Sequence, residues 1–317
     1  MCTSQPASRP RPEALQRLLG RRGFLKATAA AAALGATSAL PVAAAPAPLV
    51  GKVNRGRISI QLYSLRELMD SDLDAVFAAL ARIGYRKVEH AGFHGRSAEE
   101  FKAALDAHGL QATSGHSNVP YPFDQDAWRE IVDDAVLLGQ SYIVEPLPQF
   151  AIPSLFTGAS PPSAMWADYA HTLNQAAAIA AEAGIRVGYH NHNIEFMPMA
   201  DNPSGMAYDV LLAETDAELV HFEMDLYWVW YAEQDPVPWL DTHSGRFRQF
   251  HVKDMDENGD FANPGEGVID FARIFATAQR VRRTVPIREY IVERDDAGQD
   301  GLTFAETGYQ FLRDVRF

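Results

Sequence analysis

The sequence predicts an α/β protein formed by a single (β/α)8 TIM barrel, on three observations. Short apolar segments alternate eight times with segments of helical periodicity between residues 58 and 317. Strands that alternate with helices form parallel sheets, and eight such units in about 260 residues match the size of a barrel. A doubly wound open sheet is the alternative, but it requires a glycine-rich phosphate turn after the first strand, and residues 62–72 contain no glycine.

The first 45 residues have the layout of an export signal. Arg21, Arg22 and Lys26 precede an alanine-rich run, residues 27–45, that carries no charge. This layout resembles a twin-arginine signal peptide, so we expect cleavage near the end of the run and a periplasmic location for the mature protein. Residues 46–57 are basic and punctuated by proline and glycine, and we expect them to form an N-terminal arm.

Removal of residues 1–45 leaves 22 basic and 40 acidic side chains, a formal net charge of −18. Such a surface repels phosphate backbones, so nucleic acid is not an expected partner. No stable membrane span is expected once the signal is removed. The single cysteine, Cys2, belongs to the predicted signal, so any metal ligands of the mature protein are expected to be His, Asp or Glu.

The eight expected strands are short, apolar and separated by helix-forming segments. They span residues 58–64, 87–92, 111–116, 141–146, 186–191, 220–228, 247–254 and 288–295. Helical periodicity is clear in residues 73–84, 98–109, 126–139 and 163–184. Each of these four segments ends in a glycine a few residues before the next strand, which is the expected place of a helix C-cap: Gly84, Gly109, Gly139 and Gly184.

Polar side chains gather at the carboxyl ends of these strands, where barrel enzymes place their working residues. In chain order they are Glu89, His90, His116, Glu145, His190, His192, Asp225, His251, Lys253, Asp254 and Glu293. Alternate residues of a strand share a face, so His190 and His192 are expected to point the same way. Glu223 is expected one layer deeper than Asp225, where its charge must be paired or ligated because an unpaired buried charge is strongly destabilising.

Five segments carry a family resemblance: GIRVGYHNHNIEF, FEMDLYWVW, HVKD, NPGEGVIDF and YIVERD, in this order. Together they resemble the xylose-isomerase-like barrel superfamily of sugar isomerases and epimerases. That superfamily includes ketose 3-epimerases, inosose dehydratase and, more distantly, endonuclease IV. The resemblance covers residues 58–317 and implies one divalent metal ion held by a Glu, an Asp, a His and a second Glu.

Carried onto this chain, the last three of these ligands fall on Asp225, His251 and Glu293. His190 stands where the family has its first glutamate, and Glu145 competes with it as the fourth ligand. Two histidines with two carboxylates suit Mn²⁺, Zn²⁺, Co²⁺ or Fe²⁺ better than Mg²⁺, which prefers an all-oxygen shell. The expected cofactor is one divalent metal ion: Mn²⁺, Zn²⁺, Co²⁺, Fe²⁺ or Mg²⁺.

The resemblance implies an isomerase or epimerase that abstracts a proton next to the carbonyl of a sugar or keto-sugar. A histidine at position 190 removes one of the two bases that the family uses, which puts a symmetric exchange between two glutamates in doubt. Glu293 is then the expected base on one side, and the candidates for the other side are Glu145, His192 and Lys253. The expected substrate contacts are His116, Glu89, Tyr63 and Trp228.

Several alternatives remain open at this point. Residues 263–267 contain no Lys or Arg, which favours an unphosphorylated substrate. Dehydration or lyase cleavage of a keto-sugar or 3-keto-glycoside is the main alternative, since inosose dehydratase has a similar histidine-rich end to its fifth strand. A nuclease like endonuclease IV requires a basic groove, and a non-catalytic sugar-binding barrel predicts an empty metal site. Family members are often dimers or tetramers, so a homo-oligomer is also open.

Overall fold

The computed structural model describes residues 51–281 and 286–317. The predicted signal peptide, residues 1–45, and the first five residues of the predicted arm lie outside this part of the chain. The remainder of the arm begins beside the C-terminal end. The Gly51 amide donates a hydrogen bond of 2.5 Å to the Phe317 carbonyl, and Lys52 forms a β-bridge with Arg316. This pairing fastens the start of the described chain to its end.

Eight parallel strands form one sheet, and each corresponds to a strand that the sequence predicts. They are β1 (Ile58–Ile60), β2 (Lys87–His90), β3 (Gln111–His116), β4 (Tyr142–Glu145), β5 (Arg186–His190), β6 (Val220–Asp225), β7 (Phe247–Val252) and β10 (Glu289–Val292). Their order is β1-β10-β7-β6-β5-β4-β3-β2. An isolated parallel bridge between Gln61 and Glu89 joins the two edges, so the predicted (β/α)8 TIM barrel is confirmed.

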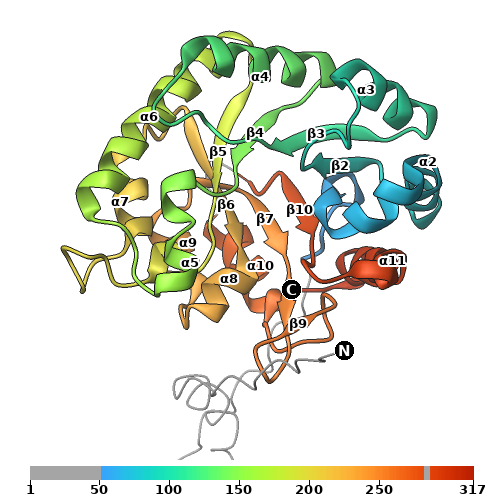
Figure 1. The fold of residues 1–317 in the computed structure, drawn as a ribbon. Helices are drawn as coiled ribbons and strands as arrows, with labels where there is room; N and C mark the ends of the chain where they lie inside the picture. Colours follow the sequence, from blue (N-terminus) through green and yellow to red (C-terminus); the bar gives the residue numbers. More distant parts are fainter. Residues whose placement is uncertain (1–50, 282–285) are drawn as a thin grey trace, which may run out of the picture. The chain divides into compact units, whose positions relative to one another are not determined.

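The helices lie outside the ring of strands (Figure 1). They are α2 (Arg66–Ile83), α3 (Ala98–Ala107), α4 (Gln125–Leu138), α5 (Ser154–Thr157), α6 (Ser163–Glu182), α7 (Ala207–Glu214), α8 (Leu226–Tyr231), α9 (Pro236–Thr242), α10 (Phe271–Val281) and α11 (Gly301–Asp314). Short 3-10 turns span Arg55–Arg57, Leu62–Leu65, Gln149–Ala151, Ile194–Phe196 and Gly298–Asp300. Within the described ranges, no helix combines the length and the apolar composition needed to cross a bilayer.

Local sequence explains where these helices begin and end. Ser97 and Glu100 form a capping box at the start of α3, and the Asp124 side chain accepts hydrogen bonds from the first amides of α4. Gly139 adopts a left-handed φ of 75° at the end of α4, a conformation that glycine reaches without steric cost. These signals set the short connections that return the chain to each strand.

The apolar core lies between the strands and the helices, and the inside of the barrel is polar. On the outer face of β7, Phe250 stacks on Phe275 of α10 with 6.0 Å between ring centroids. On the outer face of β6, Phe222 packs edge-on against Tyr208 of α7 at 5.4 Å. Residues of the opposite parity, such as Gln249, point inward. The strands therefore carry their chemistry on the face that the helices do not cover.

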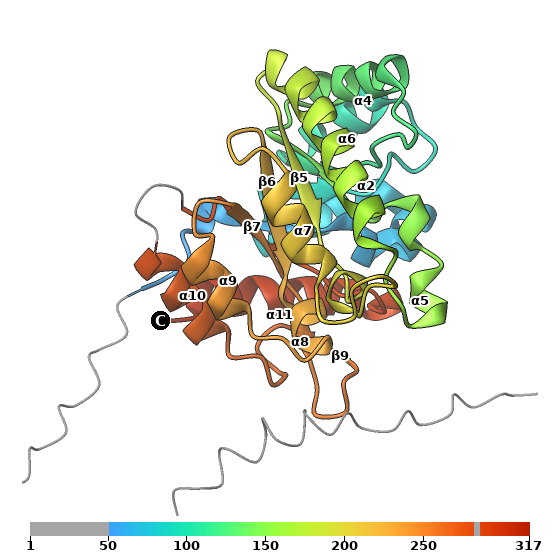
Figure 2. The ribbon, with the colours of Figure 1, turned by 90° about the vertical axis from the view of Figure 1, so that its left-hand side faces the viewer.

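The sixth strand is shorter than predicted. The sequence indicates a strand over 220–228, but β6 ends at Asp225, because the Asp225 side chain accepts a hydrogen bond of 2.9 Å from the Trp228 amide and caps α8. The next strand is followed by an antiparallel hairpin of β8 (Asp254–Met255) and β9 (Phe261–Ala262), which the sequence does not predict. Figure 2 shows α8 beside this hairpin at one end of the barrel.

Gly188, in the middle of β5, makes room for a polar residue on the neighbouring strand. A Cβ atom at position 188 would lie 2.6 Å from His221 Cε1 and 3.1 Å from Val144 Cγ2. The His221 ring is buried, and its Nε2 lies 2.7 Å from Gln249 Oε1. A side chain at position 188 would push this ring away from its partner.

We therefore expect Gly188→Ala to lower the free energy of unfolding by about 1–3 kcal/mol, the usual cost of overpacking a core. Chemical denaturation measures this change. Gly245→Ala is the matched control, because a Cβ atom there meets no heavy atom within 4 Å. Equal losses in the two variants would show that the close approach to His221 is not the cause.

Candidate active site

Polar side chains inside the barrel form a connected hydrogen-bond network. Gln249 donates to Ser114 Oγ at 3.0 Å, and Ser114 donates to Glu89 Oε2 at 2.5 Å. Gln61, from the edge of the sheet, donates to Glu89 Oε1 at 2.8 Å. All four residues are fully buried. The network therefore leads from the middle of the barrel to Glu89, near the carboxyl ends of the strands.

His251, near the end of β7, lies between carboxylates on both sides of its ring. Its Nε2 is 2.7 Å from Glu89 Oε1 and 3.0 Å from Glu223 Oε2, while its Nδ1 is 2.7 Å from Glu293 Oε2 and 3.9 Å from Asp225 Oδ2. Burial alone would lower the pKa of His251, but Glu223, Glu293 and Glu89 raise it well above its usual value. The imidazolium form of His251 is therefore favoured among these carboxylates.

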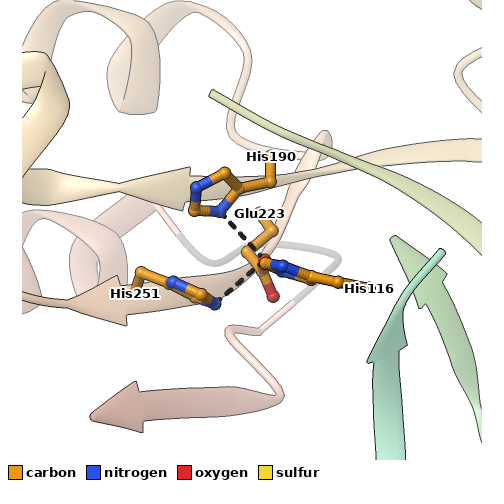
Figure 3. A group of neighbouring side chains, drawn as sticks. All are labelled: His116, His190, Glu223 and His251. Atoms are coloured by element: carbon orange, nitrogen blue, oxygen red, sulfur yellow. Dashed lines mark hydrogen bonds and ion pairs between the residues drawn. The ribbon is translucent and has the colours of Figure 1, made fainter. Parts of the chain in front are cut away.

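Three imidazoles from different strands converge on Glu223 (Figure 3). Glu223 Oε2 lies 2.9 Å from His116 Nε2, 3.2 Å from His190 Nδ1 and 3.0 Å from His251 Nε2. Glu223 Oε1 is buried and has no hydrogen-bond partner among the described residues. Burial, followed by the charge of Glu89, raises the pKa of Glu223. Glu223 is thus the shared acceptor of a histidine cluster deep in the barrel.

Lys253 is a buried ammonium group close to the mouth of the barrel, held by three carboxylates. Its Nζ lies 2.7 Å from Glu293 Oε2, 2.8 Å from Asp295 Oδ1 and 3.1 Å from Asp225 Oδ2. Burial opposes the charged form, but Asp225, Glu293 and Asp295 raise the pKa of Lys253 well above its usual value. Burial is also the main cause that raises the pKa of Asp225, to about 6.

The end of β5 brings two further histidines to the mouth. His190 Nε2 lies 3.8 Å from Asp225 Oδ2, and burial, then the charge of His251, lowers the pKa of His190 well below its usual value. The His192 ring packs 5.4 Å from the Trp228 ring. Burial lowers the pKa of His192 to about 3, so it is neutral. In the part of the chain that the structure describes, the buried atoms His192 Nδ1 and Trp228 Nε1 have no hydrogen-bond partner, which leaves two polar groups for ligand hydroxyls.

Two groups of the described side chains have the spacing of a metal site. They are Asp225, His251 and Glu293, and His116, His190, Glu223 and His251, each with its ligand atoms within 4.8 Å of one another. His251 belongs to both groups. Asp225 Oδ2 is buried, and among the described residues its nearest cationic partner is Lys253 Nζ at 3.1 Å, with which a metal ion would compete. Imidazole and carboxylate donors suit Mn²⁺, Zn²⁺, Fe²⁺ or Co²⁺, so the residues present fit a divalent metal ion.

The predicted substrate contacts lie at three different depths. Glu89 and His116 lie deepest, with 3.1 Å between Glu89 Oε1 and His116 Nε2. Trp228 lies nearer the mouth, and the centroid of its ring is 5.4 Å from Lys253 Nζ. Tyr63 lies at the rim, 44% exposed, with the Arg66 guanidinium 4.0 Å from its ring centroid. A ligand in the mouth would meet Trp228 before it met Glu89.

Glu145, which competes with His190 as the fourth ligand, lies outside the cluster. Its neighbour Val144 points into the barrel toward Gly188, and successive residues of a strand face opposite sides. The Glu145 carboxylate instead accepts four hydrogen bonds of 2.7–2.9 Å, from Asn118 Nδ2, the Val119 and Leu147 amides and the Tyr169 hydroxyl. This position does not support Glu145 as a ligand or as a base on the substrate; it anchors the loop after β3.

Two residues of the cluster are absent from the predicted site. Glu223 was expected only as a deeper, paired carboxylate, yet it joins three histidines. Asp295, in the segment YIVERD, binds Lys253 at 2.8 Å. Period 2 along the chain is the signal that finds both, because Glu223 shares a face with Asp225, and Asp295 follows Glu293 by two residues.

A single carboxylate holds the loop that follows β7. Asp254 accepts hydrogen bonds from the amides of Gly265 at 2.9 Å, Gly267 at 3.0 Å and Ile269 at 3.2 Å. A Cβ atom at Gly267 would lie 2.2 Å from the Met255 carbonyl oxygen, so the turn needs glycine there. The β8–β9 hairpin is enclosed by these bonds, and its Phe261 ring packs 4.5 Å from Tyr227 of α8.

Because Glu145 satisfies four buried or partly buried donors, we expect Glu145→Ala to lower the free energy of unfolding by several kcal/mol, since each buried donor left without a partner costs about 1–3 kcal/mol. Thermal and chemical denaturation measure the loss. Asp106→Ala, at an exposed ion pair with Lys102, is the control and should change stability little. A loss no larger than that of the control would show that Glu145 is not an anchor.

Comparison with known proteins agrees with the fold. The family model for the xylose isomerase-like TIM barrel matches residues 77–314. The inosose dehydratase of Geobacillus kaustophilus is 25% identical over 235 residues, 64% of this chain and 74% of that protein. The inosose dehydratase of Clostridium beijerinckii is 27% identical over 128 residues, 35% of this chain and 41% of that protein.

Among solved structures, a sugar phosphate isomerase/epimerase from Parabacteroides distasonis superposes with a TM-score of 0.67 at 25% identity, covering 84% of this chain and 98% of that chain. The family match, the barrel and the polar cluster at its strand ends point the same way. The chain belongs to the xylose isomerase-like TIM barrel family and is an enzyme of the group that isomerises, epimerises or dehydrates sugars.

Proposed function

We propose that the mature chain is an exported, metal-dependent isomerase or epimerase that abstracts a proton next to the carbonyl of an unphosphorylated sugar or keto-sugar. The observation that carries the proposal is the meeting of Asp225, His251 and Glu293 at the carboxyl ends of β6, β7 and β10. Lys253, the cation within this group, is already bound by three carboxylates. It is therefore not free to bind a substrate phosphate, which favours a neutral substrate.

Asp225, His251 and Glu293 would hold the metal ion, with His190 beside them as the fourth donor. His190 suits this role because its ring is neutral and its Nε2 faces Asp225 Oδ2 at 3.8 Å. A bound ion would draw electron density from the substrate carbonyl oxygen and make the neighbouring C–H more acidic. The outward direction of Glu145 leaves His190 as the better supported of the two candidates.

The residues around the cluster supply the proton transfer and the orientation of the substrate. The charges of Lys253 and His251 outweigh burial and lower the pKa of Glu293, so its carboxylate is ionised and can accept a proton. His192 Nδ1 and Trp228 Nε1, which have no hydrogen-bond partner among the described residues, would orient sugar hydroxyls. Lys253 lies 2.7 Å from Glu293 and so stands on the same side, which leaves His192 as the group that would act on the opposite face of the sugar. Proton transfer on the two faces of the sugar would then use two different kinds of side chain.

Dehydration of a keto-sugar is the second candidate. Against the effect of burial, Glu89 and Glu223 raise the pKa of His116 to about 10. His116 therefore carries a proton at neutral pH, as a group that protonates a departing hydroxyl must. The relatives from Geobacillus and Clostridium are named inosose dehydratases, and isomerisation and dehydration begin with the same C–H proton abstraction.

Metal content separates the proposed ligands from their neighbours. We expect the purified mature protein to contain about one divalent ion per chain, and Asp225→Asn, His251→Gln and Glu293→Gln to lose most of it, because each removes a charged or nitrogen donor. Elemental analysis measures the content. Glu145→Gln should keep the metal. Retention of metal in all three ligand variants would contradict the proposed site, and metal-free wild type would favour a non-catalytic sugar-binding barrel.

Solvent exchange tests the chemistry. We expect the metal-loaded protein in D₂O to place deuterium next to the carbonyl of one sugar in a panel of neutral sugars and 3-keto-sugars, because proton abstraction exposes that carbon to solvent protons. NMR follows the exchange and also detects loss of water from the substrate, which would select dehydration. Glu293→Gln should abolish exchange while binding of the sugar persists. Binding without exchange in the wild type would rule out the proposed reaction.

A further inference from the structure

A second concave site opens at the amino-terminal end of the barrel, opposite the cluster. It has a volume of about 570 Å³. Five cations and one carboxylate lie around it: Arg57, Lys87, Arg186, Arg248, Arg288 and Glu289. Each cation stands at or just before the first residues of a strand. This concentration of positive charge contrasts with the net charge of −18 of the predicted mature chain.

Little within the described residues neutralises this group. Lys87 Nζ lies 3.5 Å from Glu289 Oε1, which accounts for the one carboxylate. Arg57 and Arg186 each give one guanidinium hydrogen bond to a backbone carbonyl, at 2.9 and 2.7 Å. In the part of the chain that the structure describes, no carboxylate lies within 4.0 Å of Arg186, Arg248 or Arg288. Arg248 forms a side-chain hydrogen bond with Tyr142, a neutral residue that lines the same pocket.

Backbone geometry places these arginines together. Arg248 is the extra residue of a β-bulge, since Phe247 pairs with Phe222 and Gln249 pairs with Glu223. A bulge re-aims the side chain it carries. The amide of Arg288 donates a hydrogen bond of 2.6 Å to the Arg248 carbonyl, so the two residues are neighbours on adjacent strands. Partial burial, followed by the charges of Arg186 and Arg288, lowers the pKa of Arg248.

We propose that this pocket binds a small, multiply charged oxyanion, a compound that carries phosphate groups or several carboxylates. Four of the five cations are arginines, whose planar guanidinium groups form paired hydrogen bonds with phosphate and carboxylate oxygens. Like charges held together without partners repel one another, and an anion between them removes the repulsion. Arg186 begins β5 and His190 ends it, which separates this pocket from the catalytic mouth by roughly 13 Å along the strand.

The probes are inorganic pyrophosphate and citrate, titrated into the purified mature protein by calorimetry at low ionic strength. We expect wild type to bind one anion per chain, with an affinity that falls as salt is added. Arg248→Gln and Arg288→Gln should weaken binding roughly tenfold or more, because each removes charge-assisted hydrogen bonds. A preference for pyrophosphate or for citrate would distinguish a phosphate ligand from a polycarboxylate.

Two control variants test whether the anion binds in this pocket. Arg280→Gln removes an exposed arginine paired with Asp241 at 2.8 Å and should leave the affinity unchanged. Asp225→Asn, at the opposite end of the barrel, should also leave it unchanged, which separates this pocket from a metal ion at the mouth. Arg288 is exposed, so in the absence of any anion the Arg288→Gln variant should have a melting temperature equal to or above that of wild type, because one repelling charge is removed. Absence of binding by both probes, or equal weakening in Arg280→Gln, would overturn the proposal.

Discussion

The structure depends on one constraint, which is that charges inside a barrel must neutralise one another. His251 meets this constraint most directly, because its two ring nitrogens face Glu89 and Glu223 on one side and Glu293 on the other. Lys253 does the same for Asp225, Glu293 and Asp295. Removal of either cation would leave buried carboxylates facing each other, and a bound divalent ion would add positive charge beside Asp225, Glu293 and His251.

Burial of the apolar outer faces of the strands offsets the free-energy cost of the polar interior. Phe222 and Phe250 pack against α7 and α10, so burial of apolar surface occurs outside the sheet while the inner face carries histidines and carboxylates. Gly188 supports the arrangement by leaving space for His221. The interior is thus a scaffold of hydrogen bonds, in which each side chain restricts the orientation of the next. Such a scaffold suits catalysis, since fixed dipoles need not reorganise during a reaction.

The alternation of strands and helices was sufficient to predict the barrel, because each strand carries its own apolar pattern and each helix its own cap. Period 2 predicts a shared inner face for Glu223 and Asp225, where His190 and His251 meet them, and the same parity directs Glu145 outward. The convergence of three imidazoles on Glu223 could not be predicted, since it depends on the stagger between β3, β5, β6 and β7. The early end of β6 depends on the Asp225 side chain, which caps α8. The β8–β9 hairpin depends on the hydrogen bonds that Asp254 accepts from backbone amides.

Asp254 has a consequence for how this barrel can diversify. One side chain holds both ends of the segment that encloses the β8–β9 hairpin, through the amides of Gly265, Gly267 and Ile269. The residues between these anchor points can therefore change without moving the strands that carry His251 and Glu293. A lineage could exchange the turn at residues 256–260 and so alter which sugar fits the mouth, while the residues that transfer the proton stay the same. The choice of substrate and the chemistry can therefore evolve separately, because they depend on different segments of the chain.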